Sequence, residues 1–307
     1  MRRLFALLFL VAATLARAEG YAQHGPLQVR TVETSWTDPA RQREIPLKLY
    51  VPEGNGTYPV ILFSHGLGGS RDGGAAWGKH WASWGFISIH LQHAGSDKAI
   101  WRGGADNVLK AANASQLQAR VQDVKFVLDE LARRQGHDAL LAHADLHHIG
   151  MSGHSFGAAT TLALAGERYP LGGSLIEPRF AAFIAFSPSA TGQFEAQTER
   201  FAGFNRPFFS VTGTHDADPL GRGMTPEMRT WPYQAMPAGD KYLLVMEGKP
   251  HLFFNGSDNE PDAAASQVVK AATAAFWLAN LSGDNEARAW LRSAKWPGKT
   301  VASFATK

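Results

Sequence analysis

The chain has 307 residues, of which 45% are hydrophobic and none is cysteine. This length suffices for one large domain with a substantial core, and the lack of cysteine excludes disulfides, a cysteine nucleophile and thiolate metal sites. The formal net charge of +3 includes three arginines (Arg2, Arg3, Arg17) in a segment that we expect to be removed, which leaves 27 basic (30 minus 3) and 27 acidic residues. Charge therefore gives no reason to expect nucleic acid or an anionic membrane as a partner.

Residues 1–18 predict a secretory signal peptide. They combine a basic start, an apolar run from Leu4 to Leu15 and the small-x-small exit Ala16-Arg17-Ala18, which places cleavage before Glu19. The alternative is an N-terminal membrane anchor, but a membrane span needs about 20 apolar residues, so we expect no stable anchor. The mature protein would be a secreted or periplasmic single domain over 19–307, with 289 residues (307 minus 18).

Strand-like and helix-like segments alternate along the rest of the chain. Apolar or alternating runs predict eight strands, of which the first two form an antiparallel pair: 27–36, 44–52, 58–66, 86–95, 147–153, 180–188, 207–216 and 241–248. Helices are expected over 77–85, from Ser115 as N-cap, after residue 153, over 261–281 and over 284–291. This alternation predicts an α/β fold with a mostly parallel eight-stranded sheet and helices on both faces. Ligand sites in such sheets lie at the carboxyl ends of strands.

The segment Gly153-His154-Ser155-Phe156-Gly157 fits the pattern G-x-S-x-G between a strand and a helix. A serine at the tip of this tight turn has a strained backbone and an exposed hydroxyl. Side chains at the two glycine positions would collide with the neighbouring strand and helix. The alternative is an ordinary turn serine, but the context favours Ser155 as a nucleophile.

A serine nucleophile needs a base, and the base needs an orienting acid. The strand-turn-helix arrangement predicts the chain order serine, acid, histidine. His251 follows the last expected strand and is the candidate base. Asp216 ends the 207–216 segment, directly after its Gly-Thr-His turn, and is the preferred acid, with Asp218 as the alternative and Asp240 as a remote third candidate.

The glycine-lined loop that starts at His65 follows the third expected strand. Acyl transfer needs N–H donors for the oxyanion, and we assign them to the backbone of Leu67 and of Phe156, which directly follows the nucleophile. His65 itself is expected to be structural. The alternative interpretation of the loop is a flexible connection.

Together these segments resemble an α/β-hydrolase of the serine-esterase type over nearly all of the mature chain. More narrowly, "SHGLGGS", "LQHAGSD", "HIGMSGHSFGAAT" and "AFWLANLSGDNEARAWL" resemble bacterial predicted dienelactone hydrolases, which are similar to platelet-activating-factor acetylhydrolases and polyester hydrolases. The resemblance implies Ser155 as nucleophile, Asp216 as acid and His251 as base. Dienelactone hydrolases use a cysteine nucleophile, which this chain lacks.

Other polar and aromatic clusters are expected to be structural. The histidines at 143, 147 and 148 precede the fifth strand, at the end away from the site, so no metal site is expected. The tryptophans at 77, 81 and 84 have helical spacing and favour packing over a polymer-binding surface. Residues near the predicted cleft could shape the pocket without reacting: His93, Asp97, Trp101, Ser187 and Ser189.

The sequence predicts an exported serine carboxylic-ester hydrolase that needs no cofactor or metal and acts on a small-molecule or polymeric ester. The alternatives are a peptidase, amidase or acyltransferase with the same triad, or a catalytically silent binding protein on this fold.

Overall fold

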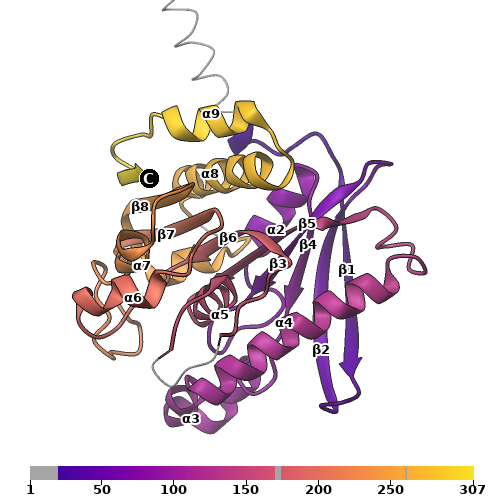
Figure 1. Ribbon diagram of the computed structural model, residues 1–307, viewed down its shortest axis with the longest axis horizontal. Helices are drawn as coiled ribbons and strands as arrows, with labels where there is room; N and C mark the ends of the chain where they lie inside the picture. The colour runs from indigo at the N-terminus through magenta and orange to yellow at the C-terminus, as the bar shows by residue number, and fades with distance from the viewer. Residues whose placement is uncertain (1–19, 170–173, 260) are drawn as a thin grey trace, which may run out of the picture.

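The eight expected strands all form in the computed structural model of the chain, and a ninth joins them. The structure describes residues 20–169, 174–259 and 261–307, so the predicted signal peptide lies outside the described part (Figure 1). The strands are β1 (Val29–Asp38), β2 (Arg43–Pro52), β3 (Tyr58–Ser64), β4 (Ile87–Leu91), β5 (Ala144–His154), β6 (Phe180–Phe186), β7 (Phe208–His215), β8 (Lys241–Pro250) and β9 (Val301–Thr306).

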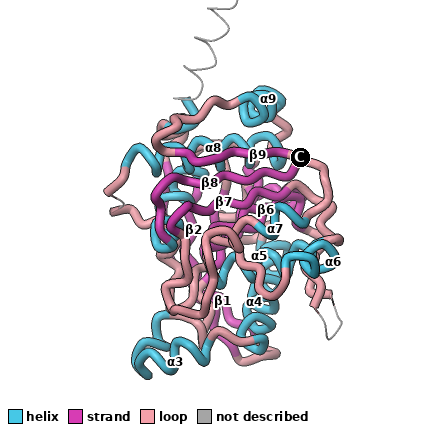
Figure 2. Tube along the Cα trace, turned by 90° about the vertical axis from the view of Figure 1, so that its left-hand side faces the viewer, coloured by secondary structure: helices cyan, strands magenta, loops and turns pink. Residues whose placement is uncertain are grey.

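In the described part of the chain these strands form one nine-stranded sheet in the order β1-β2-β4-β3-β5-β6-β7-β8-β9. Within this order the strands from β4 to β8 pair parallel with one another, whereas β1 pairs antiparallel with β2, β2 with β4 and β9 with β8. Figure 2 shows β9, β8, β7 and β6 side by side. The expected α/β class with a mostly parallel sheet is confirmed.

Helices cover both faces of the sheet (Figure 1). They are α2 (Ala75–Ser83), α3 (Gly104–Ala111), α4 (Ala114–Arg134), α5 (Phe156–Ala165), α6 (Gln197–Phe201), α7 (Trp231–Ala235), α8 (Ala263–Leu281) and α9 (Asn285–Ser293), with short 3-10 turns at η1 (Lys98–Gly103), η2 (Phe194–Ala196) and η3 (His251–Asn255). Apolar residues of α4 and α5 pack in one core and those of α2, α8 and α9 in the other. Because both faces are covered, all seven residues of β3 are buried.

Two details of the expected fold are wrong. In the described residues the sheet has nine strands rather than eight, because Val301–Thr306 adds an edge strand in which half of the residues are exposed and no apolar run occurs. Helix α4 is capped by Asn113 rather than by Ser115, which lies inside the helix. The Asn113 side chain accepts a hydrogen bond from the Gln116 N–H at 2.9 Å and so starts the helix earlier.

The topology switches direction between β3 and β5. From β3 the chain passes through α2 to β4 on one side, and it then returns through α4 to β5 on the other side of β3. Neighbouring loops that leave a sheet in opposite directions open a crevice at its carboxyl edge. The loop after β3 and the turn at Ser155 after β5 both lie at this point.

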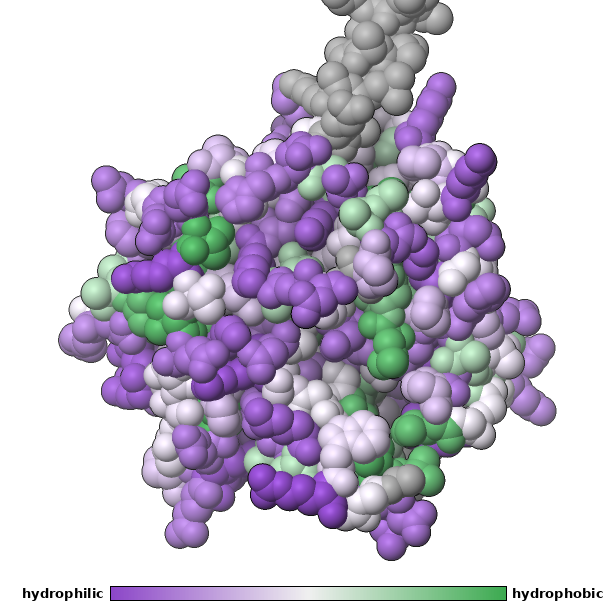
Figure 3. Space-filling model, turned by 180° about the vertical axis from the view of Figure 1, so that it is seen from behind, coloured by the Kyte–Doolittle hydropathy of each residue, from purple (hydrophilic) through white to green (hydrophobic). Residues whose placement is uncertain are grey.

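The surface seen in Figure 3 is mostly hydrophilic, with small separate apolar patches. Within the described ranges, the exposed large hydrophobic side chains are Trp101, Leu109, Ile176, Phe194 and Leu252. None of the helices that the structure describes has the length and apolar character needed to cross a membrane.

Candidate active site

Ser155 occupies a sharp turn between β5 and α5. Its φ of 56° and ψ of −111° are rare for a residue with a side chain. The flanking glycines are required sterically: a Cβ on Gly157 would lie 1.9 Å from the backbone oxygen of Ser64, and one on Gly153 would lie 2.4 Å from the Gly157 oxygen. The elbow can therefore form only with glycine at both positions, as the pattern predicts.

The structure brings Ser155, His251 and Asp216 together. In the sequence, Ser155 and His251 are 96 residues apart, and Asp216 and His251 are 35 residues apart. His251 opens η3 just after β8, and its Nε2 lies 2.8 Å from Ser155 Oγ. The other ring nitrogen, Nδ1, lies 2.7 Å from Asp216 Oδ1. With Nδ1–H donating to the carboxylate, Nε2 is free to accept the serine proton.

Asp216 is fully buried at the end of β7. Its Oδ2 accepts a hydrogen bond from Thr212 Oγ1 at 2.7 Å, which fixes the carboxylate from the strand side. A buried carboxylate needs such partners because burial alone disfavours its charge. Asp216 is thus oriented toward the histidine by the sheet itself.

Asp218 and Asp240 contact other groups. Asp218 accepts hydrogen bonds from the backbone of Leu220 and from the backbone and side chain of Arg222, so it stabilises its own turn. Burial raises the pKa of Asp218, but these hydrogen bonds outweigh that effect and lower it. Asp240 pairs with Arg288 and Arg292. Neither aspartate has a contact with His251.

Arg229 is a buried member of the site that the sequence did not indicate. Its Nε lies 3.3 Å from Asp216 Oδ1, and its Nη1 donates to Ser189 Oγ at 2.6 Å and to the Ser187 carbonyl at 3.1 Å. Burial lowers the pKa of Arg229, and the charge of Asp216 opposes this effect. Arg229 follows no pattern in the sequence, because it comes from an irregular loop that folds back over β6 and β7.

Leu67 and Phe156, the residues expected to bind the oxyanion, both line the pocket over Ser155. The loop of residues 65–69, which we call the oxyanion loop after its expected role, follows β3, and a Cβ on its Gly66 would lie 3.4 Å from the Ser155 Cβ. Among the residues that the structure describes, the N–H groups of Leu67 and Phe156 have no hydrogen-bond partner. Two free N–H groups beside a serine hydroxyl can stabilise an oxyanion.

His154, between Gly153 and Ser155, is buried under the histidine of the site. Its Nε2 lies 3.0 Å from the His251 carbonyl and so donates to it, and the two rings are 4.8 Å apart. Burial first, and then the neighbouring His251, hold the pKa of His154 well below its ordinary value. His154 is therefore neutral and supports the backbone of His251.

A pocket of about 620 Å³ opens over Ser155 and His251. Its lining includes polar groups from Ser189, Asp218, Arg222 and Arg229. Trp101 and Leu252 line the pocket and remain 55% and 70% exposed. The apolar side chains of the lining include Leu67, Trp101, Val108, Leu220, Met224 and Leu252.

The remaining clusters have structural surroundings. Trp77 and Trp81 are fully buried against α8 and β6. His148 pairs with Asp145 at the surface, and no group of three or more metal-ligating side chains occurs within residues 20–169, 174–259 and 261–307. His93 and Asp97 lie beneath the oxyanion loop rather than in the pocket.

This strand order, with a serine elbow after β5 and an acid and a histidine after β7 and β8, defines an α/β hydrolase. The chain belongs to the chlorophyllase family, whose sequence profile matches residues 18–200. It is accordingly a hydrolase that acts on esters. No curated protein matches the sequence. The match includes Ser155 and the oxyanion loop and ends before Asp216 and His251, so the structure alone places these two residues.

Proposed function

We propose that the chain is a serine carboxylic-ester hydrolase that works through an acyl-enzyme. The observation that carries this proposal is the continuous chain of contacts Ser155 Oγ–His251 Nε2 at 2.8 Å and His251 Nδ1–Asp216 Oδ1 at 2.7 Å beneath an open pocket. Contacts of this length allow proton transfer without rearrangement.

In the first half-reaction, Ser155 Oγ attacks the ester carbonyl while His251 Nε2 takes the serine proton. The N–H groups of Leu67 and Phe156 would bind the oxyanion that forms. His251 then gives its proton to the departing alcohol, and the acyl group stays on Ser155. In the second half-reaction, His251 takes a proton from water as the water oxygen attacks the acyl carbonyl. The tetrahedral intermediate then collapses, the bond between the acyl carbon and Ser155 Oγ breaks, and His251 Nε2 returns the proton to Oγ, so that the acid and free Ser155 are released.

The shape of the pocket supports an ester with an apolar part. Large apolar side chains line it, and two of them, Trp101 and Leu252, are exposed and could cover an apolar chain. Burial of each methylene contributes about 0.8 kcal/mol. We therefore propose that kcat/KM rises with chain length until these apolar side chains are covered. A panel of p-nitrophenyl esters of increasing acyl length, a polyester film and chlorophyll, to which the family's name refers, would compare small, polymeric and long-chain substrates.

The test of the mechanism is Ser155→Ala with a fluorophosphonate probe. We expect wild type to be labelled at Ser155 and the variant to be unlabelled, with a loss of about 10⁶ in kcat and an unchanged fold. Labelling of both proteins at the same rate would refute the assignment. Relative rates on matched ester and amide substrates separate the esterase from a peptidase or amidase, and added alcohol acceptors reveal an acyltransferase.

We also propose that residues 1–18 are removed on export and that the mature enzyme is secreted or periplasmic. Expression in a bacterial host, followed by N-terminal sequencing of the exported protein, should give Glu19 as the first residue.

A further inference from the structure

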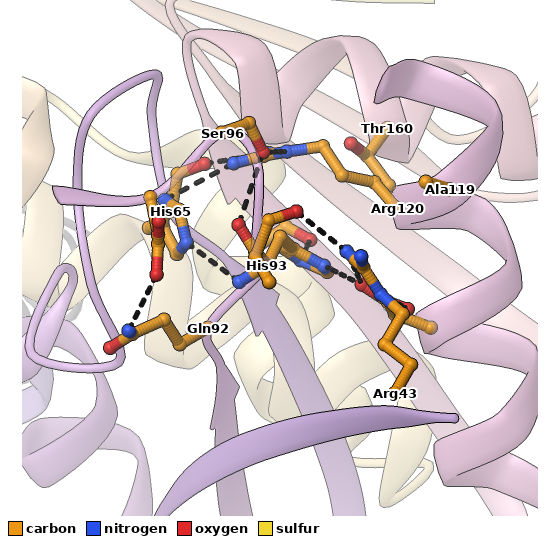
Figure 4. A network of polar contacts seen from close by, with 12 residues as sticks. Arg43, His65, Gln92, His93, Ser96, Ala119, Arg120 and Thr160 are labelled. Carbon is orange, nitrogen blue, oxygen red and sulfur yellow. Dashed lines mark hydrogen bonds and ion pairs between the residues drawn. The ribbon is translucent and has the colours of Figure 1, made fainter. Parts of the chain in front are cut away.

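The guanidinium of Arg120 is fully buried behind the oxyanion loop (Figure 4). It comes from α4, and its Nη1 donates to the His65 carbonyl at 2.8 Å while Nε donates to Ser96 Oγ at 2.9 Å. The guanidinium carbon lies 4.6 Å from the centre of the Phe156 ring. One side chain thus contacts both segments that carry the proposed oxyanion donors.

Burial of this cation is costly, and burial lowers the pKa of Arg120. Within the described part of the chain no carboxylate lies within ion-pair distance of it. Its hydrogen-bond acceptors are the His65 carbonyl and the Ser96 hydroxyl, it lies against the Phe156 ring, and its Nη2 lies 3.1 Å from Nδ1 of the His65 ring. A stabilising ion pair therefore does not explain why an arginine occupies this position.

His65 holds the next carbonyl of the same loop. Its Nε2 accepts a hydrogen bond from the backbone N–H of His93 at 3.0 Å, so Nε2 carries no proton. Burial first, and then the charge of Arg120, hold the pKa of His65 well below its ordinary value, so the ring is neutral. The proton is then on Nδ1, which donates to the Gly66 carbonyl at 2.6 Å. Because Nδ1 carries this proton, its 3.1 Å contact with Arg120 Nη2 joins two donors and is not a hydrogen bond.

The direction of the Leu67 N–H follows from the planarity of the peptide bond. The Gly66 carbonyl and the Leu67 N–H belong to one trans peptide unit, in which they point in opposite directions. The carbonyl is held on the far side by His65 Nδ1 and also accepts the Gly69 N–H at 3.0 Å. The N–H of Leu67 is therefore turned away from His65, toward the side that lines the pocket.

A second set of contacts supports His65 and its neighbours from below (Figure 4). His93 Nε2 lies 2.7 Å from Ser64 Oγ, and His93 Nδ1 lies 3.0 Å from the carboxylate of Asp123. Burial raises the pKa of Asp123, but hydrogen bonds from His93 and Arg43 outweigh burial and lower it to about 2. This charged carboxylate fixes the orientation of His93.

We propose that Arg120 and His65 are positioning residues for the oxyanion hole. Arg120 holds the His65 carbonyl and the Phe156 ring, His65 holds the Gly66 carbonyl, and together they aim the Leu67 and Phe156 N–H groups at one point beside Ser155. The inference rests on the proposed function, because it assigns a task to residues that touch neither substrate nor the reacting atoms.

The test compares Arg120→Met and Arg120→Lys with wild type on p-nitrophenyl butyrate. Fluorophosphonate titration to completion counts competent sites, so kcat refers to folded enzyme only. A misaligned donor reduces the stabilisation of the transition state but not the binding of the substrate. We therefore expect Arg120→Met to lower kcat by about 10- to 10³-fold with KM nearly unchanged. Arg120→Lys keeps one donor to the His65 carbonyl, so its kcat should lie between those of wild type and Arg120→Met.

A trifluoromethyl ketone that forms a tetrahedral oxyanion on Ser155 provides a second readout. Its inhibition constant should rise in Arg120→Met in proportion to the loss in kcat/KM, which a merely less stable enzyme would not show. A value of kcat per titrated site within about threefold of wild type would overturn the proposal.

The matched control is Arg43→Met. Arg43 belongs to the same buried network, where it donates to Asp123 and to the Ala94 carbonyl, but it contacts neither the oxyanion loop nor Phe156. We expect this variant to lower the melting temperature and to leave kcat per site unchanged. An equal loss of kcat in both variants would assign the effect to the network at large and would also overturn the proposal.

A pair of His65 variants keeps the test valid if Arg120→Met does not fold. The amide nitrogen of Asn occupies roughly the place of Nδ1, whereas that of Gln occupies roughly the place of Nε2. We expect His65→Asn to retain the hydrogen bond to Gly66 and most of the activity, and His65→Gln to lose at least about tenfold in kcat. Full activity of His65→Gln would contradict the proposal. Wild type that is not labelled at Ser155 would instead refute the proposed function, and this inference with it.

Discussion

The Arg229 guanidinium lies 3.2 Å from the Nδ1 of His251, the same ring nitrogen that faces Asp216. Both nitrogens carry hydrogens when Nδ1–H donates to the carboxylate, so this contact is not a hydrogen bond. Arg229 Nε also lies 3.3 Å from Asp216 Oδ1. One guanidinium therefore packs against both partners of the His251–Asp216 hydrogen bond and helps to fix their relative position.

The first prediction concerns Arg229→Met. This change removes a buried side chain that contacts Asp216 and holds the Ser187 carbonyl and Ser189 Oγ, so we expect His251 and Asp216 to lose their alignment and kcat to fall by about 10- to 10²-fold. The rate would be measured on one short-chain ester and expressed per site titrated with a fluorophosphonate. Arg71→Met, which removes a surface pair with Glu33, is the control and should leave kcat unchanged. Wild-type kcat in Arg229→Met would contradict this positioning role.

The second prediction separates the two aspartates of the β7 loop. Asp216→Asn should lower kcat by about 10⁴, because an amide can no longer select the tautomer that leaves Nε2 free. Asp218→Asn removes only the contacts of a turn and should cost less than about tenfold. Both variants would be assayed on the same ester after thermal unfolding has shown that each is folded. The assignment reverses if Asp218→Asn is the inactive variant.

The third prediction concerns the elbow. An alanine at position 157 would place its Cβ within 3 Å of the backbone of Ser64 and His65, so the oxyanion loop would have to move. We expect Gly157→Ala to lose most activity and about 1–3 kcal/mol of stability. Gly136→Ala, where a Cβ meets no atom within 4 Å, should change stability by less than about 0.5 kcal/mol. Equal stability of the two variants would show that the turn can adapt.

The fourth prediction is a loss of stability in weak acid. Burial lowers the pKa of His90 to about 4, so the folded state keeps this ring neutral while the unfolded chain binds a proton below about pH 6.5. Stability is therefore lost as the pH falls from about 6.5 to about 4, by up to about 3 kcal/mol for one such histidine.

His90→Asn tests this effect, since its amide can still donate to the Gly73 carbonyl that His90 Nδ1 contacts at 2.7 Å. Urea unfolding at several pH values should show that wild type is the more stable protein at pH 7 and that the difference shrinks toward pH 4.5. A difference that stays constant over this range would show that His90 does not titrate on unfolding.

Local chemistry explains which parts of the fold and site the sequence could predict. The turn at Ser155 is encoded by adjacent residues, and the positions of Asp216 and His251 follow from strand ends, which apolar runs mark clearly. The preference for Asp216 over Asp218 follows from the position of Asp216 directly at the end of a strand, and the structure places Asp216 against His251. The catalytic roles of these residues and the narrower family resemblance stay predictions.

Contacts that depend on three-dimensional folding could not be predicted. Arg229 reaches the site from a loop with no periodic pattern. Arg120 did leave a signal, since it lies three residues after Leu117 and beside Val121, on the apolar stripe of the expected helix. A charged residue on such a stripe marks a buried polar contact. The edge strand β9 left no such signal, because its residues are mixed in character and only Val301 is buried.

The backbone of Ser155 also carries a cost for the whole molecule. A residue with a side chain at a φ of 56° and ψ of −111° stores roughly 1–3 kcal/mol of strain, which the surrounding sheet and helices must counterbalance. Glycine would adopt this conformation freely, and its greater freedom in the unfolded chain costs only about 0.4–1 kcal/mol. Ser155→Gly should therefore melt a few degrees above wild type while it hydrolyses nothing. Selection for folding alone would favour glycine at this position, so a serine there reflects selection for chemistry at the expense of stability.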